Sequence, residues 1–228
     1  MVGRAAIRIY GRDQYHFFSG NTYARIDWTP GHRDALVYGP AQLTDDWKSL
    51  REAGFSQIDA ILPIPDQVYE AFVFSGTQFC RIRYLVDHGD DELLTTVSSI
   101  TPQWDSLAKA GFDHIDGAMV VPGTTDQAYF FSGTRLCRVA FNLGPDQPDE
   151  LLEGPYELCE RWSKLGLHTV DTMLPSPYMT LCTLTHAYVF SGTQAARINL
   201  VPGGGVDVMT GPISAATYWP SLHEAGYY

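Results

Sequence analysis

The chain of 228 residues repeats one pattern four times from end to end. The motif Phe-Ser-Gly recurs at intervals of about 57 residues, which is one quarter of the chain. An Arg stands five positions after each of its glycines, and a Trp and an Asp also recur once per repeat. The recurring positions are Phe18, Phe74, Phe131 and Phe190; Arg25, Arg81, Arg138 and Arg197; Trp47, Trp104, Trp162 and Trp219; and Asp34, Asp91, Asp149 and Asp207. Such a period is typical of solenoids and propellers, and it leaves no linker or second domain.

Each repeat predicts a β-hairpin, an edge strand and a short helix. Residues 70–74 are mostly β-branched or aromatic and end at Ser-Gly, which indicates a strand closed by a tight turn. Residues 78–84 suit the return strand, and residues 149–152 are typical of a short edge strand. A helix is expected at 44–55, because Thr at its start is a good N-cap and Gly54 is placed to end it.

These elements predict an all-β, four-bladed β-propeller, in which each blade has four antiparallel strands plus a short helix. We expect a single domain over residues 1–228, with repeats of approximately 1–57, 58–114, 115–169 and 170–228. The chain ends with a helix and begins with a strand at Arg4-Ala5-Ala6-Ile7. This offset predicts that the N-terminal strand lies in the last blade and closes the ring, an arrangement that a linear solenoid does not need.

The repeats resemble the hemopexin family over the whole chain. The similarity is carried by the four blades, by inner strands that read Ile-Asp-Ala-Ala or similar, by the aromatic hairpins, by the short Trp-bearing helices and best by Asn21-Thr22-Tyr23-Ala24-Arg25-Ile26-Asp27. Within that family the chain is similar to the soluble, single-domain group of plant seed albumin-2 proteins and fungal hemopexin-type lectins. Extracellular members close their ring with a disulfide between the first and last blades, and this sequence has no cysteines at those places.

The resemblance implies a calcium or sodium ion in the central tunnel. Backbone carbonyls at the start of each inner strand would hold it, since hard cations accept backbone oxygens. These positions are Arg4, Asp59, Asp116 and Asp171, with a second layer at Ala6, Ile61, Ala118 and Met173. The alternative is that each Asp hydrogen-bonds a neighbouring blade and the tunnel holds only water. The charge of Arg4 would either repel the cation or pair with an acid of the fourth blade. No organic cofactor is indicated.

The fourth repeat differs most from the others and is where a specific function is expected. Its hairpin loop is four residues longer and carries Tyr178, Met179 and Cys182, and His186 replaces a Gln or Glu of the other repeats. Apolar and aromatic residues in a loop suggest a ligand lid or a dimer contact. The alternative is simple packing over a blade edge. If the protein is an enzyme, Tyr178, Cys182 and His186 are its candidate catalytic residues.

The net charge of the chain limits the classes of binding partner. Fifteen Lys and Arg against 26 Asp and Glu give a net charge of −11, which argues against nucleic-acid or anionic-membrane binding. Acidic loops, including Asp90 and Asp91, favour cationic ligands, and the resemblance to seed proteins likewise implies polyamines. The alternative is a solvated face that keeps the protein soluble. The N-terminus lacks the apolar core of a secretory signal, so we expect an intracellular, cytoplasmic location.

Three functions remain. The first is a non-enzymatic binding protein that takes a polyamine or a carbohydrate and holds a cation in its tunnel. The second is a cofactor-independent biosynthetic enzyme, a cyclase or isomerase, with a pocket under the loop of the fourth blade. The third is an interaction scaffold or homodimer that uses the same loop. The sequence contains no nucleophile elbow, P-loop, dinucleotide fingerprint or zinc-spaced Cys/His cluster, which favours the first function.

Overall fold

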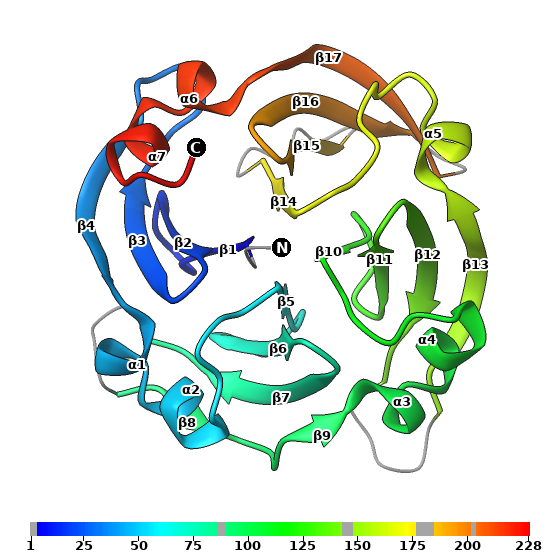
Figure 1. The fold of residues 1–228 in the computed structure, drawn as a ribbon. Coiled ribbons are helices and arrows are strands. Elements are labelled where there is room, and N and C mark those ends of the chain that lie inside the picture. The colour runs from blue at the N-terminus through cyan, green and yellow to red at the C-terminus, as the bar shows by residue number, and fades with distance from the viewer. Residues whose placement is uncertain (1–3, 86–89, 143–147, 177–184, 202–203) are drawn as a thin grey trace.

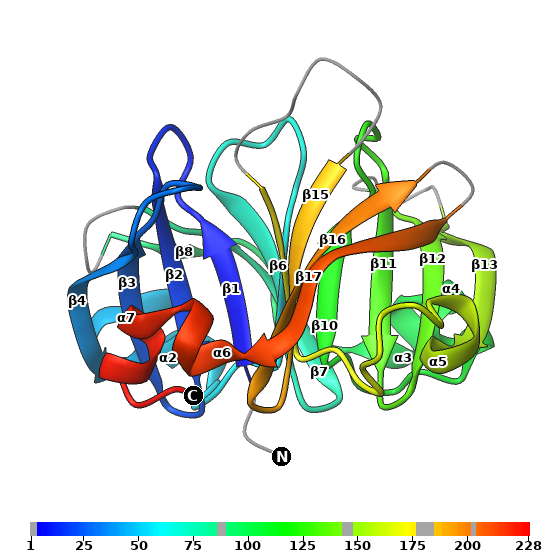
Figure 2. The same ribbon diagram turned by 90° about the horizontal axis from the view of Figure 1, so that it is seen from above.

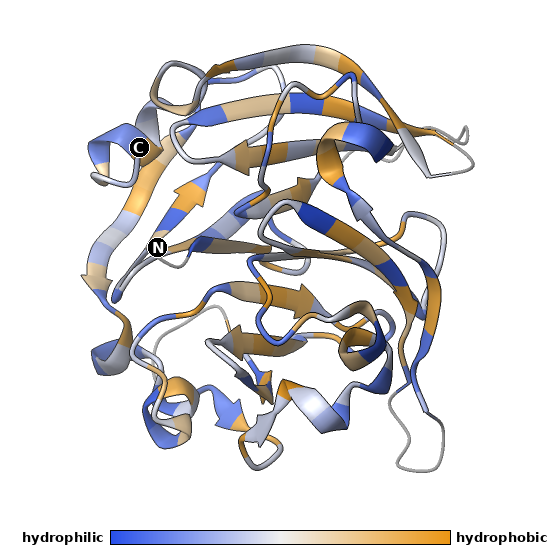
Figure 3. Cartoon of the chain, turned by 45° about the vertical axis from the view of Figure 1, so that its right-hand side comes forward, coloured by the Kyte–Doolittle hydropathy of each residue, from blue (hydrophilic) through white to orange (hydrophobic). Residues whose placement is uncertain are grey.

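The computed structural model describes residues 4–85, 90–142, 148–176, 185–201 and 204–228. They form four antiparallel sheets arranged as blades around a central axis (Figures 1 and 2). The protein is therefore the all-β, four-bladed propeller that the repeats predicted. Because both faces of each sheet pack against other blades, hydrophobic segments run along the strands of every blade (Figure 3).

The strands follow one another outward from the axis in each blade, and short helices complete it. Blade 1 contains β1 (Arg4–Arg8), β2 (Gln14–Ser19), β3 (Thr22–Asp27), β4 (Ala35–Gln42), α1 (Leu43–Asp46) and α2 (Lys48–Ala53). Blade 2 contains β5 (Ala60–Pro63), β6 (Glu70–Ser75), β7 (Gln78–Arg83), β8 (Glu92–Leu93), β9 (Ser98–Ser99), α3 (Ile100–Gln103) and α4 (Asp105–Ala110). Blade 3 contains β10 (Gly117–Val120), β11 (Gln127–Ser132), β12 (Arg135–Ala140), β13 (Glu150–Glu157) and α5 (Leu158–Arg161). Blade 4 contains β14 (Thr172–Pro175), β15 (Thr185–Ser191), β16 (Gln194–Val201), β17 (Gly205–Ser214), α6 (Ala215–Tyr218) and α7 (Pro220–Glu224).

The expected place of the N-terminal strand was wrong. β1 pairs with β2 from Arg4 opposite Ser19 to Arg8 opposite Tyr15, so it is the inner strand of the first blade and not part of the last. Each repeat begins with its own inner strand, and blade 4 already has its own in β14. The ring closes instead through α7, which packs against β4 of the first blade (Figure 1).

Four hydrophobic clusters fill the spaces between neighbouring blades, and each contains one of the recurring tryptophans. Trp47, Trp104, Trp162 and Trp219 are each at most 5% exposed. The helix expected at 44–55 is broken into α1 and α2 because Trp47 is extended, with φ −101° and ψ 92°. The break lets the indole of Trp47 pack against His16, Phe18 and Tyr23. No helix in the described part of the chain has the length and apolar character needed to cross a membrane.

The recurring Asp joins each blade to the helix of the blade before it. Asp91 of blade 2 accepts the backbone amides of Lys48 and Ser49 at 3.0 and 2.6 Å. Asp149 of blade 3 does the same for Asp105 and Ser106, at 3.1 and 2.7 Å. These amides open short helices and have no partner within them, so a carboxylate from the next blade satisfies them.

The other two recurring aspartates complete the ring. Asp34 of the first blade accepts the Ser221 amide of α7 at 2.9 Å and also accepts the Ser221 hydroxyl. Blade 3 has no second helix after α5, and there Asp207 of blade 4 pairs with the Lys164 ammonium at 2.7 Å. The once-per-blade Asp is thus an inter-blade connector, a role that the sequence pattern did not reveal.

Candidate ligand-binding site

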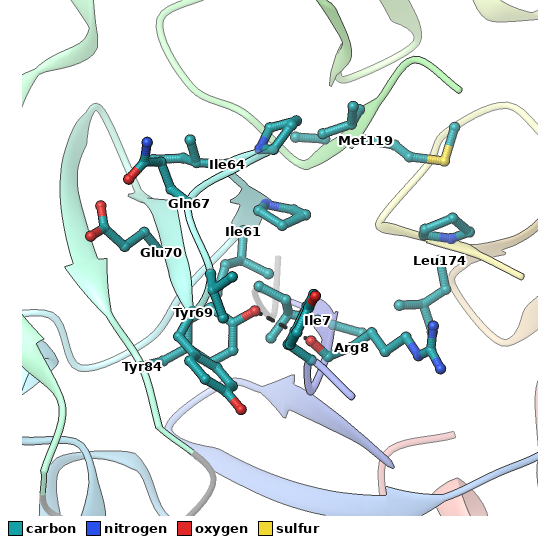
Figure 4. A pocket seen from close by; sticks show the side chains of 18 of the residues that line it. Ile7, Arg8, Ile61, Ile64, Gln67, Tyr69, Glu70, Tyr84, Met119 and Leu174 are labelled. Atoms are coloured by element: carbon teal, nitrogen blue, oxygen red, sulfur yellow. Dashed lines mark hydrogen bonds between the residues drawn. The ribbon is translucent and has the colours of Figure 1, made fainter. Parts of the chain in front are cut away.

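A cavity of about 720 Å³ opens at the end of the ring where the four inner strands finish (Figure 4). The last residues of all four inner strands line it, together with the β5–β6 connection of blade 2 and the start of the β1–β2 connection. A cavity of this size falls within the range of about 300–1,000 Å³ that accommodates small organic ligands.

Three tyrosines form one wall of the cavity. The ring centroids of Tyr10 and Tyr69 lie 5.9 Å apart at 77°, and those of Tyr69 and Tyr84 lie 5.9 Å apart at 89°. Both pairs have the edge-to-face geometry that aromatic rings favour. Tyr10 is 62% exposed at the rim, whereas Tyr84 is buried and donates its hydroxyl to the Arg8 carbonyl at 3.3 Å. Burial raises the pKa of Tyr84 above its ordinary value, so the phenol stays neutral.

Tyr69 is held in a backbone conformation that a bulky residue rarely adopts. Its φ is +66°, and Asp66 earlier in the same connection has φ +62°. Such a conformation costs about 1–3 kcal/mol and persists where surrounding bonds fix it. Here the Tyr69 carbonyl accepts the Tyr84 amide at 2.8 Å, and the Ile64 amide donates to the Glu70 carbonyl at 2.9 Å. The β5–β6 connection is therefore anchored on both sides and presents Tyr69 to the cavity.

The charged groups of the cavity wall are largely paired. Glu70 is buried and accepts hydrogen bonds from Arg81 at 2.5 Å and Arg83 at 2.9 Å. Burial by itself would raise the pKa of Glu70, but hydrogen bonds from Arg83 and Arg81 outweigh it and hold the pKa below its ordinary value. Arg8 bonds the Arg12 carbonyl and lies 3.2 Å from the Asp13 carboxylate. The wall is thus nearly neutral.

A collar of four equivalent residues forms the floor. Ala6, Ile61, Ala118 and Met173 each come from one inner strand, and each is buried. They also line a passage of about 10 Å³ that continues along the axis. That volume holds one water molecule at most. The collar therefore separates the wide cavity from the end of the tunnel where the predicted cation positions lie.

At that narrow end, three carboxylates hold the hairpin turns of their own blades. Asp59, Asp116 and Asp171 accept the amides of Gly76, Gly133 and Gly192, in each case at 2.6 Å. These hydrogen bonds stay within each blade, whereas the alternative expectation was a bond to a neighbouring blade; Asp171 in addition pairs with Arg4 of blade 1. Burial and then repulsion from Asp116 raise the pKa of Asp59 above its ordinary value, and the same two causes raise that of Asp171.

Arg4 takes the fourth position of this ring. Its guanidinium donates to the Gly192 carbonyl at 2.5 Å and lies 3.6 Å from the Asp171 carboxylate. It also lies over the Tyr228 ring, 4.5 Å from the centroid. Of the two expectations for Arg4, pairing with an acid of the fourth blade is confirmed. Within the described ranges, no group of three or more His, Cys, Asp and Glu side chains could hold a metal.

Of the residues predicted for a site in the fourth blade, His186 is the one that falls in the described part of the chain. Tyr178, Met179 and Cys182 lie outside the described residues. His186 accepts a hydrogen bond from Arg197 at 3.0 Å through its Nδ1 atom, in the way that Glu70 accepts from Arg81. Burial and then the charge of Arg197 lower the pKa of His186, so the ring is a neutral acceptor.

The two acids predicted to bind a ligand have different environments. Asp90 is exposed on the blade 2 loop, away from the cavity lining. Asp91 is buried, and helix amides occupy both of its oxygens. Its carboxylate is therefore not presented to solvent as the acidic-rim interpretation required.

The sequence interpretation missed the residues that build the cavity wall. Tyr10, Tyr69 and Tyr84 come from blades 1 and 2, whereas the expected pocket lay under the loop of blade 4. One signal pointed to them. The segment Pro63-Ile64-Pro65-Asp66-Gln67-Val68-Tyr69 carries apolar residues in a connection where polar residues are usual, and Val68 is 49% exposed.

The chain resembles proteins of legume seeds. No family model matches the sequence. Albumin-2 of Lathyrus sativus is 23% identical over 223 residues, which cover 96% of this chain and 95% of the relative. Albumin-2 of Pisum sativum is 22% identical over 220 residues, which cover 96% and 93%.

Solved structures of plant proteins are also similar to this chain. A plant albumin from Cicer arietinum showing hemagglutination superposes with a TM-score of 0.82 and 25% identity over 96% of each chain. A plant lectin with two metal binding sites, also from Cicer arietinum, has a TM-score of 0.82 and 25% identity over 98% of this chain and 97% of its own. Hemopexin fold protein CP4 from cow pea has a TM-score of 0.81 and 24% identity over 96% of each chain. The chain thus has the hemopexin fold and resembles seed albumin-2, as its motifs predicted.

Proposed function

We propose that this hemopexin-fold chain is a non-enzymatic binding protein that takes a carbohydrate at the rim of the 720 Å³ cavity. The observation that carries the proposal is the tyrosine wall, with Tyr10 62% exposed at its outer end. A tyrosine offers a rigid apolar face and a polar hydroxyl, which together suit the apolar face and hydroxyl groups of a sugar ring. The exposed side chains of Asp66 and Gln67 line the same rim and supply hydrogen-bonding groups.

The chickpea proteins support this choice of ligand. One is described as showing hemagglutination and the other as a lectin, and both superpose on nearly the whole chain. A polyamine is less well supported by the cavity, because it needs several carboxylates that are free to pair with its ammonium groups, and of the two acidic residues that line the cavity only Asp66 is exposed. Glu70 is already bound by two arginines, and Asp91 by two helix amides.

Replacing Tyr10 with alanine is expected to weaken sugar binding about twofold to tenfold, since an aromatic face contributes roughly 0.5–1.5 kcal/mol beyond its buried area. Binding is measured by calorimetry with the best methyl glycoside or oligosaccharide found on a glycan array. Tyr156→Ala is the matched control, because Tyr156 is 41% exposed but lies on the outer strand β13. The sugar should be recovered chemically unchanged.

Two results would contradict the proposal. One is equal affinity of the wild type and Tyr10→Ala for every sugar that binds. The other is binding of spermine with no sugar bound, which would restore the polyamine interpretation.

We also propose a calcium or sodium ion at the narrow end, held by the backbone carbonyls of Arg4, Asp59, Asp116 and Asp171. Three carboxylates face this end, and their mutual repulsion favours a compensating cation. The Arg4 guanidinium pairs with Asp171 at 3.6 Å, so its charge is partly compensated by that carboxylate. The two metal binding sites of the chickpea lectin point the same way. A bound cation would supply charge compensation and cross-link the four inner strands.

Calcium removal tests this second proposal. The melting temperature should fall in EDTA and recover with added calcium, because an ion that binds only the folded state stabilises it by about 2.7 kcal/mol at a hundred times its Kd. Sodium chloride and magnesium serve as the comparison salts. A melting temperature that is the same in EDTA, calcium and sodium would overturn the cation site without affecting the carbohydrate proposal.

A further inference from the structure

The cavity changes character from its rim to its floor. At the rim, Tyr10, Asp66 and Gln67 are exposed and carry hydroxyl, carboxylate and amide groups. Deeper in, the lining includes Ile7, Ile61, Met119, Met173 and Leu174, which are each at most 3% exposed. A ligand that fills the space therefore meets polar groups first and hydrocarbon afterwards.

The deep part of the cavity offers a ligand hardly any hydrogen-bonding group. The Tyr84 hydroxyl donates to the Arg8 carbonyl (Figure 4). The Glu70 carboxylate is held by Arg81 and Arg83. A sugar hydroxyl pushed against Ile61 or Met173 would lose its bonds to water and gain none, which is unfavourable. A water molecule in this apolar space would likewise lack hydrogen-bond partners.

We infer that the cavity selects amphipathic ligands, in which a sugar at the rim carries an apolar alkyl or aryl group that reaches the collar of Ala6, Ile61, Ala118 and Met173. The inference rests on the proposed carbohydrate function and adds the chemical class of the substituent. The methionines Met119 and Met173 suit this role, because their flexible, polarisable side chains adapt to apolar groups of differing shape. The collar limits the length of the group, since the passage beyond it measures only about 10 Å³.

A series of alkyl glycosides tests the inference. Methyl, butyl, hexyl and octyl β-glucosides and β-galactosides are titrated below their micelle concentrations. Affinity should rise about threefold to fourfold with each added methylene, from about 0.8 kcal/mol per buried CH₂, and level off when the chain meets the collar. The matching alkanols, which lack the sugar, separate the two parts of the site.

Variants of the floor locate the effect. Ala118→Leu makes the cavity shallower. The octyl advantage, which is the ratio of octyl glycoside affinity to methyl glycoside affinity, should fall at least tenfold in this variant, while methyl glycoside affinity stays the same. Val37→Leu is the control, because it enlarges an apolar side chain on the outer strand β4, where Val37 is 42% exposed. It should leave the affinities for all the glycosides unchanged. If Ala118→Leu does not fold, Val120→Thr places a hydroxyl on the half-buried cavity wall with little change of shape and should reduce the octyl advantage severalfold.

The outcomes are distinct. Equal affinity for methyl and octyl glycosides overturns the inference and leaves the carbohydrate function standing. So does an octyl advantage that survives Ala118→Leu or, where that variant does not fold, Val120→Thr. Alkanols that bind as tightly as glycosides of equal chain length uphold the apolar floor and overturn the carbohydrate function. A rise with chain length that needs the sugar and is lost in Ala118→Leu supports both.

Discussion

Replacing Asp34 with alanine is expected to lower the free energy of unfolding by about 3 kcal/mol and to loosen the ring where its first and last blades meet. The Asp34 carboxylate accepts the amide and the hydroxyl of Ser221, a residue 187 positions away in the sequence. Both residues are buried, at 6% and 2% exposure. Hydrogen bonds to a charged group contribute about 1.5–3 kcal/mol, and a buried donor left without its acceptor costs about 1–3 kcal/mol.

The sibling aspartates provide the matched comparison. Asp91→Ala and Asp149→Ala remove equivalent bonds to two helix amides, but those bonds join blades that also follow one another in the chain. Their loss should cost a similar amount without separating the ends of the ring. Only Asp34→Ala should speed hydrogen exchange and proteolysis in α7, since that helix would then lose the two hydrogen bonds that the Asp34 carboxylate of blade 1 accepts from it.

Chemical denaturation and hydrogen exchange measure the two effects. If Asp34→Ala is as stable as wild type, or if Asp91→Ala exposes α7 equally, the assignment of Asp34 as the closing connector is wrong.

Gly154→Ala and Gly211→Ala should each destabilise the protein by about 3 kcal/mol or more. Both glycines have left-handed φ values, +91° and +99°, which cost a residue with a side chain about 1–2 kcal/mol. A Cβ atom at Gly154 would lie 2.8 Å from the Leu136 carbonyl oxygen, and one at Gly211 would lie 2.7 Å from the Ala195 carbonyl oxygen. These are backbone atoms of the adjacent strand, so the sheet itself would have to separate.

The place of Gly154 and Gly211 in the outer strands explains why glycine is needed there. Each of these glycines lies beside a register shift in the pairing of the outer strand with its neighbour, and Gly39 has the same setting in blade 1. Such a bulge bends the strand and brings the two backbones close together. Blade 2 has Thr95 and Thr96 in this region, and there the outer strand is interrupted between β8 and β9.

Gly123→Ala is the control for the backbone conformation alone. Gly123 has φ +79°, but no atom lies within 4 Å of the place its Cβ would take. We expect a loss of about 1 kcal/mol there. Melting curves that show equal losses at Gly123 and Gly154 would contradict the close approach of the strands.

The local patterns of the sequence were sufficient for the architecture. Alternating apolar strands, Ser-Gly turns and a Trp in each repeat specify one blade, because strand period and turn chemistry depend on neighbours in the chain. Repetition of that blade four times then specified the propeller and the hemopexin resemblance. The resemblance also implied a layer of Ala6, Ile61, Ala118 and Met173, and these residues line one narrow passage on the axis.

Other features depended on contacts between distant parts of the chain, and the tertiary structure alone decided them. The repeat pattern is the same whether β1 joins the first blade or the last, so only strand pairing fixed its place. The partners of the recurring Asp lie more than 40 residues away, where no local pattern can indicate them. The tyrosine wall unites Tyr10 with Tyr69 and Tyr84 because closing the ring brings loops of different blades together at one end of the axis. The sequence by itself therefore determined how each blade is built, and the closed ring decided where a ligand could bind.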